Sequence, residues 1–135
     1  METKFNSQIC SSIEQSRRLM ELGLKKETAD MCHTPFRLKV DGEPLDYTEH
    51  CSLPLEKDIP AWSLHRLIEM MPREIECDIE NGLSFDLFGA YDAVTYHEVI
   101  GYYKDKNIYN AIISCIEDLI KEGYFNKEYL KDGNN

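Results

Sequence analysis

The sequence has few glycines and no motif built on them. Its seven glycines are scattered, and no Walker-type phosphate loop, dinucleotide-binding fingerprint, G-x-S-x-G nucleophile elbow or H-E-x-x-H motif occurs. Glycine-rich loops allow backbone N–H groups to approach a phosphate closely, so their absence weighs against the common nucleotide-binding and hydrolase classes. The motifs therefore predict no catalytic residue, no cofactor and no metal site.

Positive charge is also scarce. The chain has 15 Lys and Arg residues against 25 Asp and Glu, which gives a formal net charge of −10. A domain that binds duplex nucleic acid normally carries a basic stripe that displaces phosphate counterions. Here the basic pairs Arg17-Arg18 and Lys25-Lys26 stand in acidic sequence, so we expect no direct binding of nucleic acid. The negative charge suits either a basic protein partner or solubility alone.

Long apolar runs and regular cysteine spacings are absent as well. No stretch approaches the roughly 20 apolar residues that cross a bilayer, and residues 1–10 lack the pattern of a signal peptide. The five cysteines, at positions 10, 32, 51, 77 and 115, are odd in number and follow no repeat. We expect a soluble, cytoplasmic protein with reduced thiols and no association with membranes.

Two cysteine–histidine pairs, Cys32-His33 and His50-Cys51, raise the question of a zinc site. Adjacent side chains diverge in a helix or a strand, whereas zinc ligands within one knuckle need a wider spacing to converge. A cysteine nucleophile would need a base nearby and an electropositive site. His65 could act as a general base, but the sequence places no carboxylate or nucleophile to work with it. We interpret these residues as loop, core or surface residues.

Apolar residues at helical spacing, with end signals, predict helices over residues 12–23, 25–31, 63–71 and 107–123. Ser11 or Ser12 can cap the first helix, with Glu14 or Gln15 three residues on completing a capping box. Gly23 is the expected left-handed residue at the end of that helix. The residues that mark the helix ends therefore have a structural explanation.

Alternation of apolar and polar residues predicts three β segments. Residues 36–47 form a hairpin in which Pro44 confines the second strand to a sheet edge. Residues 74–88 form a second hairpin, with a three-residue loop over residues 80–82. That register would pair Ile79 with Leu83, Cys77 with Phe85 and Ile75 with Leu87. Residues 93–103 are predicted as a third strand of the same sheet.

These elements together predict an α+β fold. N-terminal helices precede a small antiparallel meander sheet, and a C-terminal helix packs on one sheet face. With 135 residues, of which 42% are hydrophobic, the chain is long enough for one core. We expect a single domain over residues 1–130 and a frayed tail over residues 131–135.

The exposed face of the predicted 74–88 hairpin is acidic, through Glu74, Glu76, Asp78 and Asp86. The ordinary interpretation is a solvated surface, and the functional one is a surface for a basic protein partner. A Ca²⁺ or Mg²⁺ site would normally add loop carbonyls and a tight Asp/Asn/Gly motif, and neither is present.

Aromatic residues are the other candidates for a partner surface. Tyrosines gather around the predicted third strand and the start of the last helix, and the single tryptophan lies elsewhere in the sequence. Core and rim packing explains most of these residues. Because tyrosine and tryptophan also anchor protein interfaces, Tyr96, Tyr102 and Trp62 are added to the candidate partner-binding residues.

Three segments, residues 10–31, 59–72 and 111–125, carry a resemblance. The matching residues are Cys10, Ser11, Glu14, Gln15, Ser16, Leu22, Gly23, Leu24, Thr28, Ala29, Asp30, Met31, Ile59, Pro60, Trp62, Ser63, Leu64, Leu119, Ile120, Gly123 and Tyr124. Their order resembles a group of small uncharacterised proteins from gut Bacteroidales that often occur in prophages and other mobile elements. The resemblance implies a phage or mobile-element origin. It implies no activity and no site residue.

The leading hypothesis is a non-enzymatic protein-interaction module of phage or mobile-element type, with the acidic sheet face as the partner surface. One alternative is an anti-defence factor that sequesters a nucleotide signal or blocks a defence protein, which would need a ligand pocket. Another is a small hydrolase with a His/Asp or Cys/His pair. The sequence indicates neither the partner nor the oligomeric state.

Overall fold

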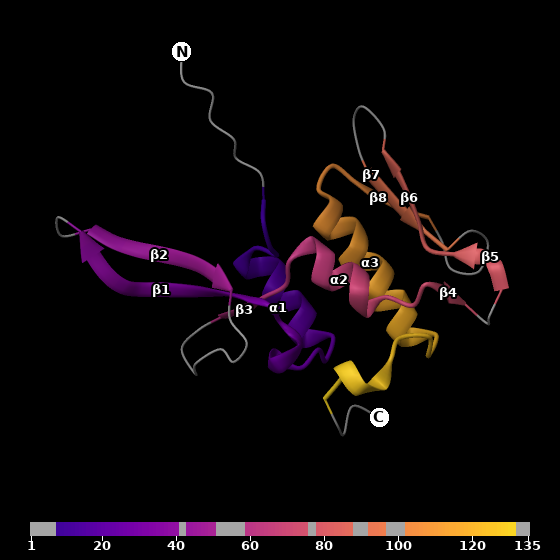
Figure 1. Cartoon of the computed structure of the whole chain (residues 1–135), viewed down its shortest axis with the longest axis horizontal. Coiled ribbons are helices and arrows are strands. Elements are labelled where there is room, and N and C mark those ends of the chain that lie inside the picture. The colour runs from indigo at the N-terminus through magenta and orange to yellow at the C-terminus, as the bar shows by residue number, and fades with distance from the viewer. Residues whose placement is uncertain are drawn as a thin grey trace, which may run out of the picture.

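The structure contains helices and short antiparallel sheets, which confirms the predicted α+β class (Figure 1). The computed structural model describes residues 8–40, 43–50, 59–75, 78–87, 92–96 and 102–131. Its helices are α1 (Ile13–Glu21), α2 (Leu64–Met70) and α3 (Ile108–Lys121), with 3₁₀ turns at Lys26–Thr28 and Lys127–Tyr129. Within these residues, none of the helices is long and apolar enough to cross a membrane.

Within the described residues, eight strands form three separate antiparallel sheets. The strands are β1 (Met31–Val40), β2 (Glu43–His50), β3 (Ile59–Ala61), β4 (Glu74–Ile75), β5 (Asp78–Gly82), β6 (Ser84–Leu87), β7 (Asp92–Thr95) and β8 (Tyr102–Asp105). The sheet orders are β2-β1-β3, β4-β5 and β6-β7-β8. The meander predicted over residues 74–103 is present in part, because β6, β7 and β8 form a three-stranded antiparallel meander, whereas β4 and β5 pair in a sheet of their own.

The predicted helix ends are confirmed. Ser12 caps α1, and its hydroxyl accepts from the Gln15 backbone N–H while the Gln15 side chain accepts from the Ser12 N–H, which completes the capping box. Gly23 adopts φ = 106°, the left-handed conformation expected after this helix. Ser63 caps α2. The segment predicted as a second helix is only the 3₁₀ turn Lys26–Thr28.

Replacing Ser12 with alanine is expected to lower the free energy of unfolding by about 1 kcal/mol. The substitution leaves the Gln15 N–H of the first turn without its side-chain acceptor. Urea denaturation followed by circular dichroism measures the change. Ser84→Ala, at an exposed serine in β6, serves as the control and should change stability by less than about 0.5 kcal/mol. Equal effects of the two substitutions would contradict the capping role.

The first predicted hairpin is confirmed, and the second is wrong. Leu38 pairs with Leu45 in the β1–β2 hairpin, and β2 is an edge strand, as Pro44 predicted. The hairpin strand β2 continues to His50, and residues 59–61 form β3.

Residues 74–87 do not pair as predicted. In β4–β5, Glu74 pairs with Gly82 and Ile75 with Asp78, while in β6–β7 Phe85 pairs with Val94. Alternation indicates which residues share a face but not which strand lies alongside. Residues 93–103, predicted as one strand, contribute to both β7 and β8. Strand β6 therefore belongs to a three-stranded sheet, which is more stable than an isolated two-stranded hairpin.

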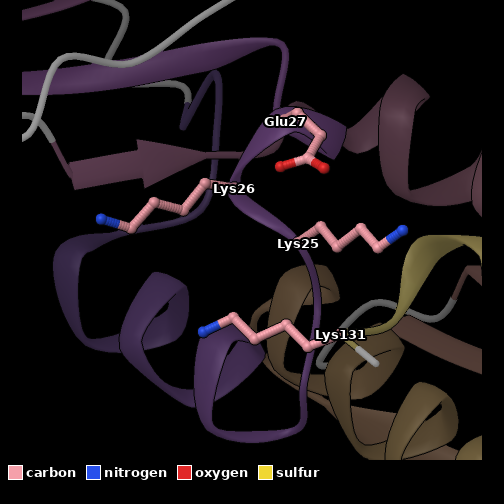
Figure 2. A pocket seen from close by; sticks show the side chains of 4 residues that line it. All are labelled: Lys25, Lys26, Glu27 and Lys131. Carbon is pink, nitrogen blue, oxygen red and sulfur yellow. The ribbon is translucent and has the colours of Figure 1, made fainter. Parts of the chain in front are cut away.

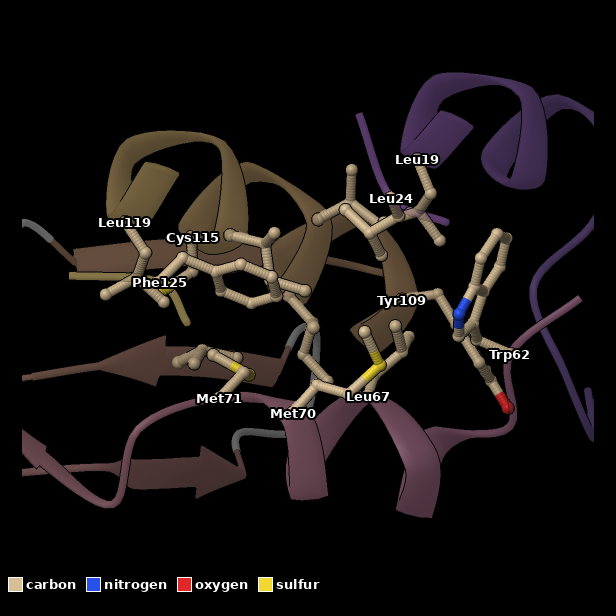
Figure 3. Packing of buried hydrophobic residues seen from close by; sticks show 14 of the residues in the cluster. Leu19, Leu24, Trp62, Leu67, Met70, Met71, Tyr109, Cys115, Leu119 and Phe125 are labelled. Carbon is tan, nitrogen blue, oxygen red and sulfur yellow. The ribbon is translucent and has the colours of Figure 1, made fainter. Parts of the chain in front are cut away.

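The main core lies between α3, α2 and the start of the chain (Figure 3). Buried α3 residues are Tyr109, Ala111, Ile112, Ile113, Cys115, Ile116 and Leu119. Leu67 and Met70 of α2 pack in the same core, together with Met71 directly after this helix. Leu19 and Leu24 join them from α1 and the turn after it. The helix α3 also contacts β7 and β8. The Tyr103 hydroxyl of β8 donates to Asp118 of α3 over 2.6 Å, which fixes this sheet against the helix.

Candidate functional site

Two of the predicted partner-binding aromatics are core residues. Trp62 and Tyr96 are each 0% exposed, so neither can contact a partner in the folded protein. The Trp62 indole N–H donates to Thr28 Oγ1 over 2.9 Å, and the Tyr96 hydroxyl donates to the Pro72 carbonyl over 2.5 Å. Both side chains satisfy the usual condition for burying an aromatic with a polar end. Their assignment to a partner surface was therefore wrong.

The predicted acidic face does not form as one hairpin surface. Asp86 of β6 pairs with Ala93 of β7, and Asp78 of β5 pairs with Ile75 of β4, so the two acidic residues lie in different sheets. Glu74 is exposed, as predicted. Glu76 lies outside the described residues, as do the side chains of Asp78, Asp86 and Tyr102. The pairing on which this surface depended is absent from the described strands.

The segments that carry the sequence resemblance contact one another. Asp30 accepts hydrogen bonds from the Ser63 backbone N–H, over 2.8 Å, and from the Ser63 hydroxyl. The Arg66 side chain donates to the Thr28 carbonyl over 2.8 Å. With the indole bond of Trp62 to Thr28, these contacts join residues 28–30 to the start of α2. These motif residues therefore have a structural role, and they build no exposed site.

The structure brings together one cysteine and one histidine that are distant in sequence. Cys10 Sγ lies 4.0 Å from His33 Nε2, and the same nitrogen lies 2.8 Å from the Ser11 carbonyl oxygen. Because a carbonyl oxygen only accepts, Nε2 carries the proton and cannot take one from the thiol.

The Cys10 thiol itself is poorly suited to attack. Burial, and secondly the charge of Asp30, raise the pKa of Cys10 to about 11, so the thiol stays protonated at neutral pH. Cys10 is also 4% exposed. This geometry does not support a Cys/His hydrolase.

A second histidine has a carboxylate partner that the sequence analysis missed. His65 Nε2 lies 3.3 Å from Glu69 Oε1, one helical turn along α2. The i, i+4 spacing within a predicted helix was the signal that could have revealed the pair. Both side chains are largely exposed, at 84% and 49%, so the pair adds little to stability.

This pair lies at a cavity of about 540 Å³. The lining residues are His65, Ile68, Glu69, Met71, Arg73 and Leu83. A hydrogen bond of 2.8 Å from the Leu83 N–H to the Arg73 carbonyl closes one wall. The lining offers a cation, a histidine–carboxylate pair and apolar contacts, but no serine, threonine or cysteine that could act as a nucleophile.

A second cavity, of about 340 Å³, is lined by Lys25, Lys26, Glu27 and Lys131 (Figure 2). Figure 2 shows the ammonium groups of Lys26 and Lys131 extending to the same side, while Lys25 extends the opposite way. The sequence analysis treated Lys25-Lys26 as an isolated basic pair and Lys131 as the start of a frayed tail. The Lys131 backbone N–H donates to the Gly23 carbonyl over 2.8 Å, whereas residues 132–135 of the predicted tail lie outside the described residues.

In the described parts of the chain, no three His, Cys, Asp or Glu side chains come together in a way that could hold a metal ion. Comparison with known proteins adds no relative. No family model matches the chain, and no curated protein or solved structure matches it significantly.

Proposed function

We propose that this protein is a non-enzymatic protein-interaction module, of the phage or mobile-element type that its sequence resembles, and that it binds its partner through the β1–β2 hairpin. The supporting observation is the reach of this hairpin beyond its sheet. Strand β3 pairs only with Met31–His33 of β1, whereas β1 and β2 remain paired as far as Val40 and Glu43. Figure 1 shows the ribbon extending away from the three helices.

Such a ribbon favours recognition through the backbone. A lone two-stranded ribbon is marginally stable in water, and its outer edges carry N–H and C=O groups without strand partners. Among the described strands, β2 is an edge, and β1 has no second neighbour beyond His33. A partner protein that adds a strand to one of these edges would pair the free groups and stabilise the hairpin.

The test removes the ribbon while leaving its base intact. Thr34 and Tyr47 are partners in the β1–β2 register, so replacing residues 35–46 with Asn-Gly should close a shorter hairpin in the same register. The intact protein is expected to capture a partner from a Bacteroidales lysate, identified by mass spectrometry, and the shortened protein is expected to lose it. A ¹H–¹⁵N spectrum with the core resonances unchanged shows that the shortened chain is folded.

Glu74→Lys provides the matched control. This substitution reverses a charge on the one residue of the predicted acidic face whose exposure is described. If the hairpin is the binding surface, Glu74→Lys retains capture. Loss of capture with Glu74→Lys, and not with the shortened hairpin, would place the partner on the acidic side and contradict the proposal. No specific capture by the intact protein, relative to a charge-matched control protein, would also contradict it.

A further inference from the structure

The cavity lined by Lys25, Lys26, Glu27 and Lys131 departs from the charge of the rest of the chain. Its lining residues carry three ammonium groups and one carboxylate, on a protein whose formal net charge is −10. Excess positive charge in a hollow attracts anions more strongly than the same charges spread over a convex surface. The local charge therefore points to an anionic ligand.

Within the described residues, the three lysines form no ion pair. Elsewhere, Arg18 lies 3.1 Å from a Glu117 oxygen and Lys121 lies 3.8 Å from the other Glu117 oxygen. Lys25, Lys26 and Lys131 form no such pair with any acidic side chain of the described residues. In a chain with an excess of carboxylates, three unpaired cations around one cavity are available to a ligand.

Backbone contacts between distant segments fix the positions from which these side chains project. Leu24 and Leu130 form an antiparallel bridge. The Lys25 N–H donates to the Tyr129 carbonyl over 2.9 Å, and the Lys131 N–H donates to the Gly23 carbonyl over 2.8 Å. Two lysines that are 106 positions apart in sequence thus belong to one paired element. Such an arrangement lowers the entropic cost of bringing several cations to one ligand.

We propose that this cavity binds a small ligand through its phosphate group. Lys26 and Lys131, which extend to the same side, contact the phosphate, and Lys25 supplies a third positive charge. Lysine ammonium groups bind phosphate as point charges. Because each Coulomb energy scales with the ligand charge, the net positive charge of the lining attracts a dianion about twice as strongly as a monoanion. A volume of about 340 Å³ suits a small molecule.

Titration of the ¹⁵N-labelled protein tests the site independently of the proposed hairpin function. Inorganic phosphate, pyrophosphate and adenosine monophosphate are added separately at low salt, with adenosine as the uncharged comparison. The phosphate compounds are expected to shift the backbone resonances of residues 24–28 and 129–131, and adenosine is not. Tighter binding of adenosine monophosphate than of phosphate would indicate a nucleotide-like ligand, and equal binding would indicate recognition of phosphate alone.

Charge-removing variants connect the binding to the lysines. Lys26→Gln and Lys131→Gln are each expected to weaken binding about tenfold, equivalent to ~1.4 kcal/mol. Lys106→Gln, at an exposed lysine before α3 and outside the cavity lining, is the matched control and should retain binding. Raising the salt concentration to about 0.1 M should weaken binding, because the Debye length falls to about 10 Å.

The opposite results are equally clear. No resonance shift with any phosphate compound, shifts confined to other residues, or equal weakening by Lys106→Gln would overturn the proposal. The same spectra report whether each variant is folded, so a loss of binding can be distinguished from a loss of structure.

Discussion

Replacing Trp62 with alanine is expected to lower the free energy of unfolding by about 3–5 kcal/mol, the usual cost of removing a large buried aromatic side chain. Trp62 is 0% exposed and belongs to the main core cluster. The substitution also removes the donor that reaches Thr28 Oγ1 over 2.9 Å. Since domains of this size are usually stable by only about 5–15 kcal/mol, the melting temperature should fall by roughly 10–20 °C.

Urea denaturation and thermal melts followed by circular dichroism measure this change. Ile9→Ala is the matched control, because it truncates a large apolar residue that is 58% exposed, and it should change stability by less than about 0.5 kcal/mol. Trp62 is also the single tryptophan of the chain, so its fluorescence should be blue-shifted and protected from acrylamide. A Trp62→Ala variant as stable as Ile9→Ala would restore Trp62 as a candidate surface residue.

Raising the pH above about 9 is expected to destabilise the protein strongly, because its buried thiols resist ionisation in the folded state. Burial, and secondly the charge of Asp118, raise the pKa of Cys115 to about 12, and the pKa of Cys10 is raised to about 11. Burial is also the main cause that raises the pKa of Tyr96.

The direction of this change in stability follows from the unfolded chain, in which the pKa of cysteine is about 8.5 and that of tyrosine about 10. The unfolded state releases these protons first, so stability is complete below about pH 8.5 and decreases as the pH rises toward the folded pKa values. Two thiols give a slope of about 2.7 kcal/mol per pH unit between about pH 8.5 and 11, and a total loss of about 6 kcal/mol by about pH 11.

Urea denaturation at a series of pH values between about 7 and 11 measures the slope. Cys115→Ala should reduce it by about 1.4 kcal/mol per pH unit, because one protonated thiol is removed. Ile112→Ala, which truncates another 0% exposed α3 residue without removing a thiol, should lower stability and leave the slope unchanged. A slope unaffected by Cys115→Ala would contradict the prediction.

The helices were predictable because their signals are local. Ser12 with Gln15, Gly23, and Ser63 act within one or two helical turns, so the sequence around each residue contains the whole capping motif. The alternation in residues 74–87 correctly placed Ile75 on a buried face, where it is 1% exposed. Burial of individual residues could therefore be predicted even where the strand pairing could not.

Strand partners and both cavities depend on contacts that a linear pattern does not specify. Phe85 of β6 pairs with Val94 of β7, and β7 also pairs with β8. The alternation within each strand does not indicate which strand lies beside it. The lysine cavity depends on the bridge between Leu24 and Leu130. Trp62 and Tyr96 were assigned wrongly for a related reason. Tryptophan and tyrosine occur both in cores and in protein interfaces, so their presence in the sequence does not distinguish the two.

The pairing of residues 23–25 with residues 129–131 has a consequence for biosynthesis. A ribosome adds roughly 5–20 residues per second, and the N-terminal part of the chain emerges first. The apolar side chains of α1 are therefore buried only after α3 and residues 129–131 have been synthesised. Until then the emerging polypeptide exposes Leu19 and Leu24, apolar side chains of the kind that chaperones bind.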